Sequence, residues 1–169
     1  MNRWQTREVL VAENNDDDFF ILYRSFQETT GRLYRVHDGE QAIEYLSGLG
    51  RFCDRQMYPL PQALLLDLKL RGKDGFEVLQ WIRGHSALRT LIVVILTASS
   101  DPEDIRRAYD LRANSYLIKP SFERYAAMAR VFEAFWLKIN HPPVLPLTDE
   151  ERQGRELTFV RRYLNTAET

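Results

Sequence analysis

Five short apolar runs divide the chain, and each is followed by a stretch whose apolar residues recur at helical spacing. The runs at 63–66 and 91–96 are apolar throughout and do not alternate with polar residues. A strand of this kind is buried on both faces, as in a parallel sheet covered by helices. The runs therefore predict an α/β fold with a doubly wound, five-stranded parallel sheet and right-handed crossovers, its strands near residues 8–13, 33–36, 63–66, 91–96 and 115–118.

Polar residues and glycines indicate where the helices begin and end. The polar run 14–18 precedes the first helical stripe, and Asp38 and Asp101 precede two later ones. Such side chains accept hydrogen bonds from the free N–H groups of a first helical turn. Pro102 suits the first turn of its helix, where a missing N–H costs nothing. Gly31 is expected to close the first helix.

The chain after the fifth strand divides into a helix, a proline-rich segment and a tail. The helix, from about residue 122 to residue 140, is rich in aromatic residues. Residues 141–146 contain prolines that exclude a regular helix, so they are expected to form a stiff linker. A capping-box pattern opens the last segment, 147–169. We expect one domain over 1–140, a linker, and a partly helical tail too short to be an output domain.

Composition excludes several classes of protein. The 169 residues carry 23 basic and 24 acidic side chains, and this balance gives no electrostatic signature of nucleic-acid binding. The single cysteine, Cys53, excludes an internal disulfide framework. Neither a signal-peptide pattern nor an apolar run of membrane-spanning length occurs. We therefore expect a cytoplasmic protein that does not bind a membrane.

Polar side chains follow four of the predicted strands. Glu13, Asp67, Thr97 and Lys119 come directly at the strand ends, and Asn14 follows Glu13. The carboxyl ends of parallel strands meet at one edge of the sheet, where ligands bind in open α/β folds. Clustered carboxylates favour a hard cation such as Mg²⁺, and an ammonium and a hydroxyl suit phosphoryl oxygens. The pattern indicates phosphoryl chemistry, in which a carboxylate can be the nucleophile.

These residues resemble the receiver domain of two-component response regulators over about residues 8–140. The similarity is carried by Glu13, Asp67, Gly75, Thr97 and the pair Lys119-Pro120, in this order at the right strand ends. The resemblance implies a flavodoxin-like fold with strand order 2-1-3-4-5.

Within the family, the chain is similar to stand-alone regulators that partner bacterial and cyanobacterial phytochromes. The long connection 51–62, the segment 135–137 (Phe-Trp-Leu) and the absence of an effector domain suggest this group.

The resemblance assigns the phosphoacceptor and the metal ligands. Asp67 would accept a phosphoryl group from a sensor histidine kinase. Mg²⁺ would be held by Glu13, Asn14, Asp67 and the backbone carbonyl of Lys69. The protein would be a switch with at most slow autophosphatase activity and not an enzyme.

The resemblance also assigns the residues that respond to phosphate. Thr97 and Lys119 would bind the phosphoryl group, and Thr97 and Tyr116 would form the switch. In the family the Lys119–Pro120 bond is cis. The output would be a changed surface on the fourth helix, fifth strand and fifth helix, recognised by a partner or by a second copy. We expect a homodimer and no direct DNA binding.

Two positions depart from the family pattern, and they keep other functions open. Asn14 stands where the family has a second metal-binding acid, and Arg71 stands where a proline is usual. The loss of that acid leaves open a receiver-like interaction module that is no longer phosphorylated. An aspartyl-phosphate hydrolase needs a second acid where this chain has Lys69. Asp16 and Asp17 are candidates to supply part of the missing charge. Acids at a helix start are also favoured by the helix dipole, and this second explanation applies to Asp17 and Asp18.

Overall fold

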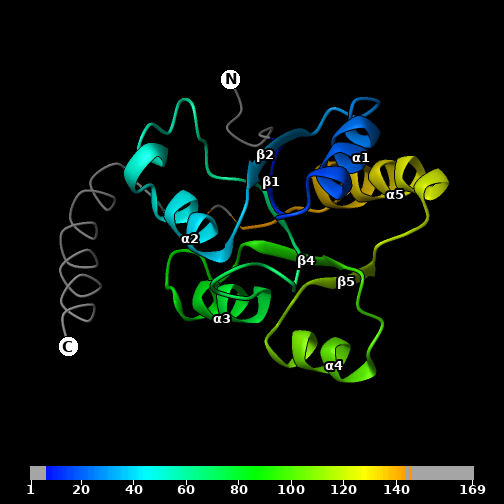
Figure 1. Cartoon of the computed structure of the whole chain (residues 1–169). Coiled ribbons are helices and arrows are strands. Elements are labelled where there is room, and N and C mark those ends of the chain that lie inside the picture. Colours follow the sequence, from blue (N-terminus) through cyan, green and yellow to red (C-terminus); the bar gives the residue numbers. More distant parts are fainter. Residues whose placement is uncertain (1–6, 144, 146–169) are drawn as a thin grey trace.

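A computed structural model of the protein describes residues 7–143 and 145. Its centre is a parallel sheet with the strand order β2-β1-β3-β4-β5 (Figure 1), as predicted. The strands are β1 Glu8–Ala12, β2 Arg32–Val36, β3 Ala63–Leu66, β4 Ile92–Thr97 and β5 Ser115–Ile118.

Helices cover both faces of the sheet (Figure 1). On one face α1 and α5 lie side by side, and η3 continues α5. The other face is covered by α2, α3 and α4. The helices are α1 Asp16–Phe26, α2 Gly39–Ser47, α3 Gly75–Gly84, α4 Pro102–Asp110 and α5 Tyr125–Phe132, with 3₁₀ turns η1 Gly50–Phe52 and η2 Phe122–Arg124 and the π-helical segment η3 Glu133–Ile139.

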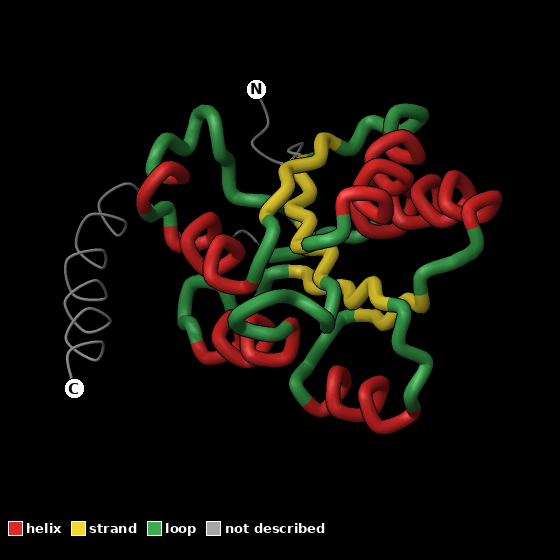
Figure 2. The backbone as a smooth tube through the Cα atoms, viewed as in Figure 1, coloured by secondary structure: helices red, strands yellow, loops and turns green. Residues whose placement is uncertain are grey.

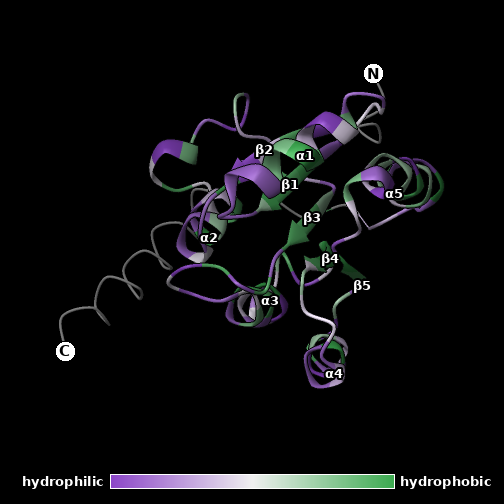
Figure 3. Cartoon of the chain, turned by 45° about the vertical axis from the view of Figure 1, so that its right-hand side comes forward, coloured by the Kyte–Doolittle hydropathy of each residue, from purple (hydrophilic) through white to green (hydrophobic). Residues whose placement is uncertain are grey.

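Two hydrophobic cores, one on each face, explain the unbroken apolar runs. Leu64 and Leu66 of β3 pack into the core under α2, α3 and α4, while Ala63 and Leu65 pack into the core under α1 and α5. Successive side chains of a strand point to opposite faces, so a strand between two helical layers buries all of them. Figure 3 shows this as hydrophobic central strands between helices whose outer faces are hydrophilic.

Helix starts follow the local signals in the sequence. The side chain of Asp38 accepts from the N–H of Gln41 at the start of α2, and Asp101 accepts from Glu103 at the start of α4. Pro102 occupies the first turn of α4, as predicted. Each such cap contributes on the order of 1 kcal/mol to helix stability.

Two expectations about the backbone are wrong, and a third is confirmed in its extent. α1 ends at Phe26, well before Gly31, and the Thr29 N–H and hydroxyl both donate to the Phe26 carbonyl beyond this end. The predicted helix 122–140 is helical from Phe122 to Ile139, but it is divided into η2, α5 and η3. No cis peptide bond occurs among the described residues, so Lys119–Pro120 is trans, the form that X–Pro bonds usually prefer.

The connection between α2 and β3 is a long loop (Figure 2), and the guanidinium group of Arg55 ties it to the helix. Arg55 donates to the carbonyls of Tyr45 and Leu46 at the end of α2, at 2.6 and 2.8 Å, and to that of Tyr58. The Tyr45 hydroxyl donates to the Pro59 carbonyl at 3.0 Å. The end of α2, where the Gly48 N–H also donates to the Tyr45 carbonyl, is thereby capped in addition by the loop that follows it.

The predicted tail, 147–169, lies outside the described residues. Among the residues that are described, no helix is both long and apolar enough to cross a membrane.

Candidate functional site

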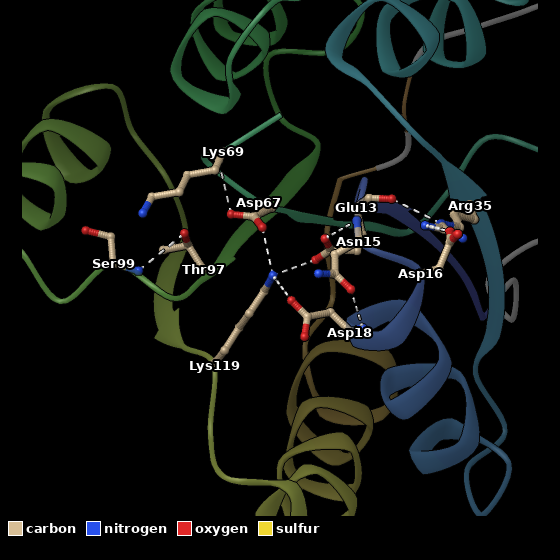
Figure 4. Close-up of polar contacts among 10 residues, drawn as sticks. All are labelled: Glu13, Asn15, Asp16, Asp18, Arg35, Asp67, Lys69, Thr97, Ser99 and Lys119. Carbon is tan, nitrogen blue, oxygen red and sulfur yellow. Dashed lines mark hydrogen bonds and ion pairs between the residues drawn. The ribbon is translucent and has the colours of Figure 1, made fainter. Parts of the chain in front are cut away.

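The register of the sheet brings four strand ends to one edge. Glu13 follows β1, Asp67 follows β3, Thr97 ends β4 and Lys119 follows β5. Figure 4 shows their side chains gathered there, with Asp67 between Thr97 on one side and Glu13 on the other. The pairing that aligns these ends joins Ala12 to Leu66, Leu66 to Ile95 and Thr97 to Ile118.

The ammonium of Lys119 is the centre of this cluster. Its Nζ lies 2.7 Å from Glu13 Oε2, 2.8 Å from Asp18 Oδ2 and 2.7 Å from Asp67 Oδ2. The Lys119 side chain is only 10% exposed. Burial lowers the pKa of Lys119, but hydrogen bonds to Asp18, Asp67 and Glu13 outweigh it, and the pKa lies above its ordinary value. Three carboxylates thus share one fixed positive charge.

Asp67 is held by the backbone on both sides. Its N–H donates to the Ala12 carbonyl at 3.1 Å, and its Oδ1 accepts the N–H of Lys69 at 3.1 Å. The chain turns back at Gly75, whose N–H donates to the Leu68 carbonyl at 3.0 Å. The carboxylate is buried and turns its second oxygen to Lys119. Asp67 therefore presents an oriented carboxylate oxygen beside an ammonium.

Glu13 is the second buried acid of the cluster. Its N–H donates to the Val36 carbonyl at 3.1 Å, and its Oε1 accepts the N–H of Asn15 at 2.9 Å. Burial raises the pKa of Glu13, and the hydrogen bond from Lys119 opposes this increase. Asn14, beside it, is half-buried, and its side chain makes no hydrogen bond with any described residue.

Thr97 and Tyr116 are linked through the segment that follows β4. Thr97 is fully buried, and its hydroxyl oxygen lies 3.5 Å from the backbone nitrogen of Ser99. The hydroxyl of Tyr116 donates to the Ser99 carbonyl at 3.1 Å. Burial raises the pKa of Tyr116 above its usual value. A change at Thr97 and a change at Tyr116 would therefore act on the same backbone segment.

The oxygen donors at this edge fit a hard cation. Glu13 Oε2 and Asp67 Oδ2 both lie 2.7 Å from one point, now occupied by the Lys119 ammonium, and carboxylate oxygens are the ligands Mg²⁺ prefers. No group of three or more His, Cys, Asp or Glu side chains in the described part of the chain is placed to hold a metal alone. A cation would need other oxygens, such as the Asn14 amide, the Lys69 carbonyl, water or phosphate.

Of the three acids in the first turn of α1, only Asp18 joins the cluster. Asp16 forms an ion pair with Arg35 at 2.7 Å, and Asp17 is exposed. The role of Asp18 was not predicted, because the sequence shows only an acidic helix start. The sequence feature that could have located Asp18 is its spacing of three residues from Asn15. The Asn15 side chain caps the helix by accepting the Asp18 N–H at 3.0 Å. That cap begins α1 beside the strand ends, and Asp18, the third residue of the helix, points toward Lys119 (Figure 4).

Comparison with known proteins agrees with this geometry. The model of the response regulator receiver domain matches residues 9–130. A relative, the probable methanogenesis regulatory protein FilR2 of Methanothrix harundinacea, is 39% identical over 141 residues, covering 80% of this chain and 86% of the relative. The response regulator Rcp1 of Synechocystis sp. is 32% identical over 133 residues, covering 77% and 88%.

Solved structures of this group are also similar. The Mn²⁺-bound form of Rcp1 has a TM-score of 0.73 at 31% identity, covering 81% of this chain and 99% of that chain. The phosphorylated cyanobacterial phytochrome response regulator RcpA has a TM-score of 0.75 at 30% identity, covering 81% and 98%. The family match over most of the chain, together with these relatives, shows that the protein belongs to the response regulator receiver domain family.

Proposed function

We propose that the protein is a phosphorylation switch in which Asp67 accepts a phosphoryl group from a sensor histidine kinase. The observation that carries this proposal is the buried Asp67 carboxylate, held 2.7 Å from the Lys119 ammonium and sharing it with Glu13. Burying a carboxylate costs free energy unless it is paired. Here the ion pair with Lys119 orients an Asp67 oxygen at the carboxyl ends of the strands, where ligands bind in open α/β sheets.

The proposed reaction is a direct displacement at phosphorus. An Asp67 oxygen attacks the phosphorus of a phosphohistidine, the new P–O bond forms as the P–N bond breaks, and the imidazole leaves with the electron pair and takes up a proton. Lys119 and the Thr97 hydroxyl bind the phosphoryl oxygens. Little covalent assistance is needed, because such reactions depend on positioning and on charge neutralisation.

Mg²⁺ is the cofactor that the donor set favours. Glu13, Asn14, Asp67 and the Lys69 carbonyl would hold it, and bound Mg²⁺ supplies charge neutralisation to the phosphoryl oxygens. Asn14 offers a neutral amide oxygen in place of a carboxylate, so the ion is held by less negative charge. The same residue favours the alternative, a receiver-like interaction module that binds partners without being phosphorylated.

Phosphorylation would be read out on the surface formed by α4, β5 and α5. Thr97 and Tyr116 both act on Ser99, the first through a backbone N–H and the second through a carbonyl. A phosphoryl group that draws Thr97 toward it would disturb this link and favour a second conformation of Tyr116. The kinase partner is proposed to be of the phytochrome type, because the similar protein RcpA is a cyanobacterial phytochrome response regulator. The balanced charge of the chain favours a protein partner and not direct contact with DNA.

A small phosphodonor separates the three candidate functions. We expect the protein, incubated with Mg²⁺ and acetyl phosphate, to gain the mass of one phosphoryl group, and to lose this ability when EDTA removes the metal. Intact-mass spectrometry measures the adduct, and a phosphate-release assay measures turnover. Continuous phosphate release would support a hydrolase, and no adduct at any Mg²⁺ concentration would support the unphosphorylated module.

Homodimerisation is a further part of the proposal. Exposed apolar side chains lie along α5 and η3, with exposed fractions of 68% for Val131, 49% for Phe135 and 66% for Ile139. Contiguous exposed apolar surface commonly marks an interface. We expect light scattering after gel filtration to give the mass of two chains in the presence of beryllofluoride, a phosphate analogue. The mass of one chain with and without the analogue would contradict a dimer.

A further inference from the structure

We propose that Asp18 is a positioning residue for Lys119, and that it retains the ammonium when Glu13 and Asp67 turn to a metal ion. This inference rests on the proposed Mg²⁺-dependent function of Asp67. The first turn of α1 would thereby help the site to bind a cation, although none of its residues would be a ligand of that cation.

The geometry poses a competition for the same oxygens. Lys119 Nζ lies 2.7 Å from both Glu13 Oε2 and Asp67 Oδ2, so the ammonium already engages one oxygen of each carboxylate that would hold a metal ion. Withdrawal of Lys119 would leave these oxygens free for a metal ion. A buried ammonium that loses its carboxylate partners is strongly destabilised unless another partner remains.

Asp18 is that remaining partner. Its Oδ2 lies 2.8 Å from Lys119 Nζ, and its side chain is 34% exposed, compared with 5% for Glu13 and 7% for Asp67. A short movement of the ammonium toward Asp18 is thus also a movement toward water. The backbone of Asp18 is fixed by the Asn15 cap, so its carboxylate stays beside the site.

Asp18 also restores charge that the departure at Asn14 removes. With an amide at position 14, Glu13 and Asp67 are the buried acids at the strand ends. By binding Lys119, Asp18 lets both of them present their full negative charge to a cation. Its first-turn neighbours are not placed to do this, since Asp16 pairs with Arg35 and Asp17 is exposed.

Calorimetric titration of the full chain with Mg²⁺ alone tests this role. We expect Asp18→Asn to weaken Mg²⁺ binding about tenfold, the typical value of a hydrogen bond to a charged group. Asp17→Asn is the matched control, because it removes the same charge from the same helical turn. It should change the dissociation constant by no more than about twofold. Asp18→Glu should restore binding to within about threefold of the original.

A double-mutant cycle distinguishes positioning of Lys119 from a general effect of charge. In a Lys119→Gln background there is no ammonium to retain, so Asp18→Asn should weaken Mg²⁺ binding by only about twofold. Thermal unfolding followed by circular dichroism checks that each variant is folded.

The two levels of the proposal fail in different ways. Equal weakening by Asp18→Asn in both backgrounds, or equal effects of Asp18→Asn and Asp17→Asn, would overturn the role of Asp18 while leaving the function of Asp67 intact. A parent protein that binds no Mg²⁺ and forms no adduct with acetyl phosphate would overturn both.

Discussion

Asp67→Asn is expected to abolish phosphorylation by acetyl phosphate, with the rate of adduct formation falling by at least about 100-fold. The amide is nearly the same size, so the buried position is kept, but it has no anionic oxygen to attack phosphorus. The loss should be complete even at saturating Mg²⁺, because it is a loss of the nucleophile. Intact-mass spectrometry after a fixed incubation measures it.

The control for this variant is Asp17→Asn, which removes one carboxylate from an exposed position beside the site. It should be phosphorylated at nearly the parental rate. An adduct of undiminished yield in Asp67→Asn would mean that another residue is the phosphoacceptor. Peptide mapping of the parent protein would then identify it.

Gly75→Ala is expected to destabilise the protein by about 2–4 kcal/mol, because an added Cβ has no space. The new carbon would lie 2.3 Å from the carbonyl oxygen of Asp67 and 2.7 Å from the Cα of Leu68. Relief of this clash requires backbone movement at the phosphoacceptor itself. Urea unfolding measures the loss of stability, and the rate of phosphorylation should fall with it.

The matched control lies at the other end of the same helix. An added Cβ at Gly84 would meet no atom within 4 Å. Gly84→Ala should therefore leave stability unchanged or increase it by about 0.5–1 kcal/mol, through helix propensity. If Gly75→Ala were as stable as Gly84→Ala, the close approach of α3 to the Asp67 strand would not be a constraint on the fold.

Much of the fold was predictable because its causes are local. The runs at 63–66 and 91–96 lack polar alternation, and the structure buries these strands on both faces. Asp38 and Asp101 cap helices because their own side chains reach the first free N–H groups. The strand order came from the resemblance, and the structure confirms it.

What could not be predicted depends on distant parts of the chain. Arg55 caps α2 only because the following loop folds back over it, which no local pattern in 48–62 reveals. The end of α1 was misplaced at Gly31, which lies beyond the helix, where an added Cβ would come within 3.1 Å of the Leu137 side chain and 3.2 Å of the Phe26 side chain.

The candidate site likewise has a part that could be predicted from the sequence and a part that could not. Placing Glu13, Asp67, Thr97 and Lys119 at one edge needs only the rule that parallel strands end together. The contact between Asp18 and Lys119 depends on the angle at which α1 crosses the sheet, and the sequence does not specify this angle. The assigned roles of these residues remain predictions.

The position of Lys119 has a consequence for the protein in the absence of metal. Because the lysine serves as a built-in counter-ion for the acids around it, the folded chain does not rely on a bound cation to offset their repulsion. Domains in which ion binding drives folding lose their structure when the ion is removed. If Mg²⁺ binds as proposed, its supply would set how readily Asp67 is phosphorylated and would have little effect on the amount of folded protein.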